Sequence, residues 1–113
     1  IMEINQTIQE NIVILKLKGR MDAITVANFE DIALKIPQNK DILGIVIDFQ
    51  ELEYISSAGL RGLLKLAKNC RSSNKKLACC CLSKEIAEIF RISGFNMLIK
   101  LCSNLDEALA LVK

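Results

Sequence analysis

Two adjacent serines stand where an apolar strand gives way to a helix, and they are the residues of this chain best placed to take part in chemistry. The segment reads DFQELEYISSAGL from position 48 to position 60. The first turn of a helix leaves backbone N–H groups unpaired and carries a partial positive charge. A serine hydroxyl at this place therefore either caps the helix or belongs to a site that can hold an anion. Both interpretations of Ser57 stay open at this point.

The usual catalytic arrangements are missing from the chain. It has no histidine, which excludes Ser-His and Cys-His catalytic pairs and every His-ligated metal site. Residues 59–62 are too short to cradle phosphates and lack the Lys-Ser/Thr ending of a P-loop. We expect Asp48, Glu51 and Glu53 to belong to a solvated acidic loop, because paired carboxylates without a positioned nucleophile do not make a hydrolase. The sequence therefore predicts a protein that is not an enzyme.

The chain has five cysteines, three of them consecutive at positions 79–81. An odd number in a chain of intracellular character indicates reduced thiols rather than a disulfide framework. In a strand, Cys79 and Cys81 would face one way and Cys80 the other, so the three thiolates could not converge on one tetrahedral zinc ion. We expect these cysteines to act as small buried apolar residues. No metal and no cofactor is predicted.

The serines need a strand and a helix to position them, and hydrophobic periodicity predicts both. Residues 42–49 are almost unbroken apolar sequence, as expected for a strand covered on both faces. Residues 57–71 carry apolar side chains at helical spacing. The predicted buried face consists of Leu60, Leu63, Leu64, Ala67 and Cys70.

The other elements follow from the same periodicities and from cap residues. We expect a hairpin of strands 4–9 and 11–18, a helix over 22–36 ended by Pro37, a strand over 77–82, a helix from Ser83 closed by Gly94, a strand over 97–101 and a last helix capped by Asn104. The alternation of strands and helices from residue 42 onward implies parallel pairing with right-handed crossovers. The predicted fold is α/β, with an N-terminal antiparallel hairpin followed by parallel βαβα units in a mixed sheet and helices mainly on one face. Functional sites in such sheets lie at the carboxyl ends of strands, where the two serines are expected.

These motifs resemble those of the STAS domain, the fold of bacterial anti-sigma factor antagonists. In that family a strand leads through a short loop into a Ser-Ser/Thr-Gly-Leu helix start, which residues 56–60 resemble, although Ser56 stands where many members have Asp and Ala58 where many have Ser or Thr. Residues 19–22 read Gly-Arg-Met-Asp and match the Gly-x-x-Asp loop ahead of the family's first helix. The resemblance covers nearly the whole chain, so residues 1–113 are interpreted as a single STAS domain. Ser57 falls on the serine that is phosphorylated in such antagonists.

The resemblance implies a partner-switching function. In its unphosphorylated form, the protein would bind an anti-sigma factor that is also a serine protein kinase. The kinase would use ATP and Mg²⁺ to phosphorylate Ser57, and the complex would dissociate. A serine phosphatase would then restore the unphosphorylated protein. An exposed Leu60 or Ile55 would supply apolar contact to the partner. The expected contact residues are Asp22, Ser56, Ser57, Ala58, Leu60 and Arg61, with Ser83 at the outer edge.

Two alternatives remain open from the sequence. In the first, the chain is a scaffold STAS module of a larger signalling complex or transporter, and the serine pair is only a cap. In the second, a nucleotide binds near the Ser57 loop, although no phosphate-binding motif supports it.

Charge and hydropathy indicate which kinds of partner and which cellular location to expect for this protein. Fifteen Lys and Arg residues against thirteen Asp and Glu give a formal charge of +2, and the basic residues are dispersed along the chain. Nucleic acid is therefore not an expected partner. No apolar run approaches the roughly 20 residues that span a bilayer, and no signal peptide is recognised at the N-terminus. We expect no membrane insertion and a cytoplasmic location.

Overall fold

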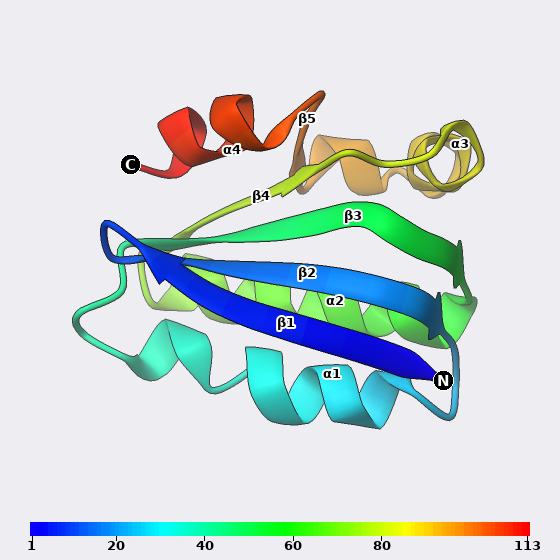
Figure 1. Ribbon diagram of the computed structural model, residues 1–113, viewed down its shortest axis with the longest axis horizontal. Helices are drawn as coiled ribbons and strands as arrows, with labels where there is room; N and C mark the ends of the chain where they lie inside the picture. Colours follow the sequence, from blue (N-terminus) through cyan, green and yellow to red (C-terminus); the bar gives the residue numbers. More distant parts are fainter.

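The computed structural model describes residues 1–113 and contains one five-stranded sheet in the order β1-β2-β3-β4-β5 (Figure 1). The strands are β1 Met2–Gln9, β2 Ile12–Met21, β3 Gly44–Ile55, β4 Lys76–Cys80 and β5 Lys100–Cys102. The helices are α1 Val26–Ala33, α2 Ser57–Ser72, α3 Lys84–Ser93 and α4 Leu105–Val112, with short 3-10 turns η1 Ile36–Gln38 and η2 Phe95–Met97. No helix combines the length and the apolar character that a membrane crossing requires.

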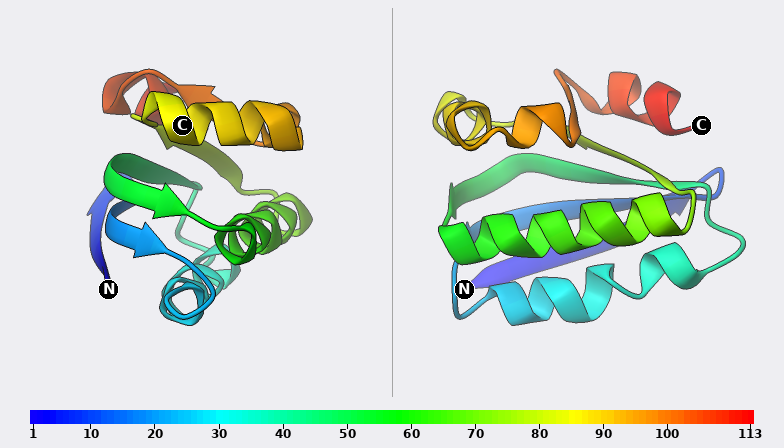
Figure 2. Two further views of the ribbon diagram at one scale, coloured as in Figure 1. Left: turned by 90° about the vertical axis from the view of Figure 1, so that its right-hand side faces the viewer. Right: turned by 180° about the vertical axis from the view of Figure 1, so that it is seen from behind.

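The pairing pattern confirms the predicted fold class. Strands β1 and β2 are antiparallel, whereas the β2–β3, β3–β4 and β4–β5 pairs are parallel. Helices α1, α2 and α3 all contribute side chains to the larger apolar cluster on one face of the sheet. Helix α4 covers the other face, where it packs on a smaller cluster. Figure 2 shows α1 and α2 side by side on the face opposite α4.

The hairpin and several helix ends form where local sequence signals predicted them. Glu10 and Asn11 both adopt left-handed backbone conformations, with φ of 52° and 67°, and so make the two-residue turn between β1 and β2. Gly94 closes α3 in a left-handed conformation with φ of 80°. The Asn104 side chain accepts a hydrogen bond of 2.9 Å from the Glu107 N–H at the start of α4.

Strand β3 is longer than predicted, and the acidic loop expected around Glu51 and Glu53 does not exist. The strand continues to Ile55 because it keeps pairing with β2 after its ladder with β4 has ended at Asp48. A register shift in the β2–β3 ladder follows Asp48, which indicates a β-bulge at this point. Beyond it Leu52 and Ile55 are buried while the two glutamates face solvent. The strand predicted over 97–101 is also shifted, since β5 begins only after the η2 turn.

The buried face of α2 is rotated from the predicted one. Its buried residues are Gly59, Gly62, Leu63, Leu66 and Cys70. Leu64 was predicted to be core and is only half-buried, as are Leu60 and Ala67. The predicted face left out Leu66 and both glycines, because a hydrophobic pattern gives no weight to glycines that lie where the helix touches the rest of the protein.

The three consecutive cysteines do not alternate as predicted. Strand β4 ends at Cys80, and Cys81 takes a left-handed conformation with φ of 64°. Cys79 belongs to the larger cluster, whereas both Cys80 and Cys81 pack on the α4 side. All five cysteines are free, and burial raises the pKa of the Cys70 thiol to about 12.

Candidate functional site

The carboxyl ends of β2 and β3 meet at one end of the sheet. Met21 and Ile55 are paired in the ladder, and the Ser56 N–H donates to the Met21 carbonyl oxygen at 2.9 Å. The residues that follow each strand therefore lie close together. These are Asp22 in the loop to α1 and Ser57 at the start of α2, and the end view in Figure 2 shows both chain segments leaving the sheet here.

The two serines at the start of α2 have different roles. Ser56 is the N-cap: its backbone is extended, with φ of −95° and ψ of 176°, and its Oγ accepts the Gly59 N–H at 3.3 Å. Ser57 is the first residue of the helix and is exposed. The interpretation of Ser57 as the cap is wrong by one residue, because Ser56 supplies the cap. The Ser57 hydroxyl is left at the positive end of the helix, facing solvent.

Two glycines let α2 approach its neighbours and so position the serines. A Cβ atom on Gly59 would lie 2.9 Å from the Met21 carbonyl oxygen, too close for any real side chain. A Cβ atom on Gly62 would lie 2.7 Å from Cγ2 of Val26 in α1. The glycines thus hold the first turns of α2 against the end of β2 and against α1. Their presence is explained by packing inside the fold.

Asp22 organises the loop between β2 and α1. Its Oδ1 accepts the N–H groups of Ile24 and Thr25, both at 3.0 Å. The Thr25 Oγ1 accepts the Asp22 N–H at 2.9 Å and donates to the Arg20 carbonyl oxygen at 2.8 Å. The backbone hydrogen bonds from Thr25 and then Ile24 lower the pKa of Asp22, so its carboxyl is ionised at neutral pH. The Asp22 carboxylate therefore fixes the backbone of this loop, which leaves the sheet at the same end as α2.

Ile24 is an exposed apolar residue at this end of the sheet, and the sequence analysis missed it. Ile24 is 88% exposed, whereas Ile55, a predicted contact residue, is 3% exposed and belongs to the core. Leu60 is half-buried and packs against the same core. The signal for Ile24 was its position just ahead of α1 and outside the stripe of Phe29 and Ala33 that the helix buries.

Two arginines lie at this end of the sheet. Arg61 is exposed and lies one turn after Ser57 on the same face of α2. Arg20 and Tyr54 are paired at the ends of β2 and β3, with the guanidinium carbon 4.3 Å from the ring centroid. Arg61 is the better placed of the two arginines to face an anion at Ser57, because the two residues share a helix face.

Ser83 has a structural role at the start of α3. Its Oγ accepts the Ile86 N–H at 3.2 Å, which confirms it as the cap of this helix. It follows the carboxyl end of β4, but β3 extends well beyond the point where β4 stops pairing with it. The contact role of Ser83 stays a prediction.

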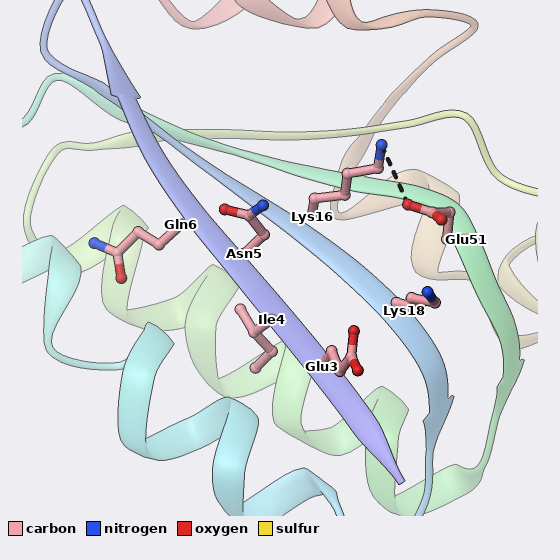
Figure 3. Close-up of a pocket in the computed structure, with 7 residues that line it drawn as sticks. All are labelled: Glu3, Ile4, Asn5, Gln6, Lys16, Lys18 and Glu51. Carbon is pink, nitrogen blue, oxygen red and sulfur yellow. Dashed lines mark ion pairs between the residues drawn. The ribbon is translucent and has the colours of Figure 1, made fainter.

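A polar hollow of about 470 Å³ lies over β1, β2 and β3 (Figure 3). Its lining includes two acidic residues, Glu3 and Glu51, and two basic residues, Lys16 and Lys18. Lys16 Nζ and a Glu51 carboxylate oxygen form an ion pair of 3.2 Å across it. The charged residues of the lining are therefore balanced in number.

Comparison with known proteins agrees with the sequence motifs and the fold. The family model of the STAS domain matches residues 3–108. The chain therefore belongs to the STAS domain family.

One curated relative is BtrV of Bordetella bronchiseptica, a candidate anti-sigma factor antagonist. It is 39% identical over 69 residues, which cover 61% of this chain and 60% of that relative. The match thus spans less than two thirds of the relative's length.

Solved structures share the fold at low sequence identity. A candidate anti-sigma factor antagonist of Thermotoga maritima superposes with a TM-score of 0.89 at 16% identity, covering 96% of this chain and 93% of that one. The Bacillus cell fate determinant SpoIIAA in its phosphorylated form has a TM-score of 0.76 at 16% identity, covering 98% of this chain and all (100%) of that one. At these identities the likeness shows the fold alone.

Proposed function

We propose that this protein is an anti-sigma factor antagonist whose binding is switched by phosphorylation of Ser57. In its unphosphorylated form it binds an anti-sigma factor that is also a serine protein kinase. The kinase transfers a phosphoryl group from ATP to the Ser57 hydroxyl, and the two proteins then dissociate. A serine phosphatase restores the binding form. The observation that carries the proposal is the exposed Ser57 hydroxyl at the start of α2, left free because Ser56 serves as the cap.

The site is suited to hold a phosphate without disturbing the fold. The first turn of α2 provides unpaired N–H groups and the positive end of the helix dipole. Arg61 lies on the same helix face one turn away. Asp22 lies on the neighbouring loop and opposes the new charge. The helix therefore tolerates the phosphate on Ser57, while the Asp22 carboxylate repels it. This balance would allow a phosphatase to remove the phosphate.

The proposed partner surface surrounds the serine. Ile24 is added to it as an exposed apolar anchor, and Ile55 is removed. The residues assigned to the surface are Asp22, Ile24, Ser56, Ser57, Ala58, Leu60 and Arg61, with Ser83 at the edge. The protein acts by binding, and the kinase and the phosphatase supply the chemistry.

Phosphopeptide mapping tests the proposal. The protein is incubated with ATP, Mg²⁺ and the kinase recovered with it from its native cells, and we expect the label on the peptide that contains Ser57. The Ser57→Ala variant should take up no label, and Ser56→Ala should still be labelled. Absence of phosphorylation in the wild-type protein would contradict the switch and favour a scaffold role in a larger complex or transporter.

Ile24→Ser should weaken binding of the unphosphorylated protein to its partner without affecting the fold. Ile24 is almost fully exposed, so its replacement removes little apolar contact within the protein. Loss of an apolar anchor at an interface typically raises Kd by tenfold or more, about 1.4 kcal/mol or more. Isothermal titration with the partner measures the effect. Leu111→Ser is the matched control, because Leu111 is an exposed apolar residue of α4 on the opposite side of the sheet.

A further inference from the structure

The side chains of Asp48, Cys80 and Cys81 come together on the α4 side of the sheet. A carboxylate oxygen and the two sulfur atoms all lie within 4.8 Å of one another. Asp48 and Cys80 are direct neighbours in the β3–β4 ladder. Cys81 joins them because its left-handed backbone turns the chain where β4 ends. The fold thus gathers three groups that bind metals, none of which belongs to the serine site.

Asp48 is the one charged residue buried in the protein, with 6% of its surface exposed. None of the four ion pairs of the structure includes it. Its Oδ1 accepts the Gln50 N–H at 2.9 Å, within the β-bulge that follows. A buried carboxylate with no cationic partner is costly. A bound cation would compensate its charge, and the bond from Gln50 would hold the carboxylate in orientation, as outer partners of metal ligands do.

The distances suit a tetrahedral ion with sulfur and oxygen ligands. Zinc binds thiolates at about 2.3 Å and carboxylates at about 2.0 to 2.2 Å, which places the ligand atoms of a tetrahedral site about 3.5 to 3.8 Å apart. The longest separation in the cluster must therefore contract by about 1.0 to 1.3 Å at most. Cys80 is fully buried, whereas Cys81 is half-buried and is the one ligand of the three that solvent can touch appreciably.

We propose that Asp48, Cys80 and Cys81 form a binding site for one zinc-class divalent cation, with water as the fourth ligand. Two thiolates favour a soft or borderline cation over Mg²⁺ or Ca²⁺, which prefer oxygen ligands. The expectation from the sequence that these cysteines bind no metal assumed that Cys81 continues the strand, and the structure contradicts that assumption.

The ion would link β3 to β4 at the end of their ladder. Burial, a hydrogen bond with Cys81 and the Asp48 charge raise the pKa of the Cys80 thiol, so it keeps its proton when no cation is present. A bound zinc ion would displace this proton, since coordinating thiols are deprotonated. Because the ion binds the folded state, zinc should also raise the melting temperature.

Cobalt titration of the full-length reduced protein tests the site. Co²⁺ replaces Zn²⁺ in such sites and gives sulfur-to-metal charge-transfer absorption when thiolates bind it. We expect saturation at one Co²⁺ per chain and loss of the absorption when Zn²⁺ is added. Cys81→Ala and Asp48→Asn should each raise the Kd for cobalt at least tenfold. Cys79→Ala is the matched control, because Cys79 is the adjacent thiol on the other face of the sheet, and it should bind as the wild type does.

Two results would overturn the proposal. One is the absence of charge-transfer absorption in the wild-type protein with cobalt in excess. The other is wild-type absorption that persists in Cys81→Ala, which would assign the ion to other thiols. Circular dichroism establishes that each variant is folded. Cys81 is half-buried, so its variant should fold even if Asp48→Asn does not. Zinc should raise the melting temperature of the wild type and of Cys79→Ala but not that of Cys81→Ala.

Discussion

Ser57→Asp is expected to fold normally and to bind the anti-sigma partner at least about a hundredfold more weakly than the wild type. The fold should survive because Ser57 is exposed at the first position of α2, where the helix dipole favours a negative charge. Binding should fail because a partner surface packed on Ser57 would desolvate this charge without supplying a cation of its own. Burying an unpaired charge costs several kcal/mol, which corresponds to two or more powers of ten in Kd.

Two serine variants serve as controls for this experiment. Ser57→Ala should keep the affinity of the wild type, because it removes only an exposed hydroxyl. Ser56→Ala should lower the free energy of unfolding by about 1 kcal/mol, because it deletes the cap to Gly59, but should still bind. Titration calorimetry gives the affinities and urea unfolding gives the stabilities. If Ser57→Asp bound as tightly as Ser57→Ala, the switch at this serine would be disproved.

Local signals predicted most of the fold because they act within a few residues. The caps at Ser83 and Asn104 and the left-handed Gly94 form where they were expected, since each depends only on its own turn of helix. The mixed sheet also followed from the order of elements, because a parallel crossover has one allowed hand. These features can be predicted without knowing the tertiary packing.

Tertiary contacts decided the features that the sequence did not predict. Strand β3 continues past residue 49 because β2 pairs with it across a bulge. This pairing cannot be predicted from the sequence of either strand by itself. Cys81 adopts a left-handed conformation at the end of β4, which composition could not reveal because cysteine has no preference for it. Its thiol consequently faces Asp48 and not the side of Cys79.

The sequence located the segments of the candidate site but not which of their side chains are exposed: Ile55 is buried and Ile24 is exposed. The family resemblance placed Asp22 near Ser57, and the pairing of Met21 with Ile55 brings the segments that follow them to the same end of the sheet. Either serine could have been the cap, since both have the right side chain. The bond from the Ser56 N–H to Met21 decides between them, because it keeps Ser56 extended at the end of the ladder and starts the helix at Ser57.

Leu66→Ala should lower the free energy of unfolding by about 2 to 5 kcal/mol, the range for deleting a fully buried leucine side chain. Leu66 is 0% exposed and belongs to the large cluster, although the helical pattern had placed Leu64 in the core instead. Leu64 is half-buried in a shallow groove beside Leu98, so Leu64→Ala should cost about 1 kcal/mol or less. Both variants make the same chemical change two residues apart on one helix, so the difference between them reports burial alone. Urea unfolding followed by circular dichroism measures both values. A larger loss for Leu64→Ala than for Leu66→Ala would contradict the observed buried face of α2 and favour the predicted one.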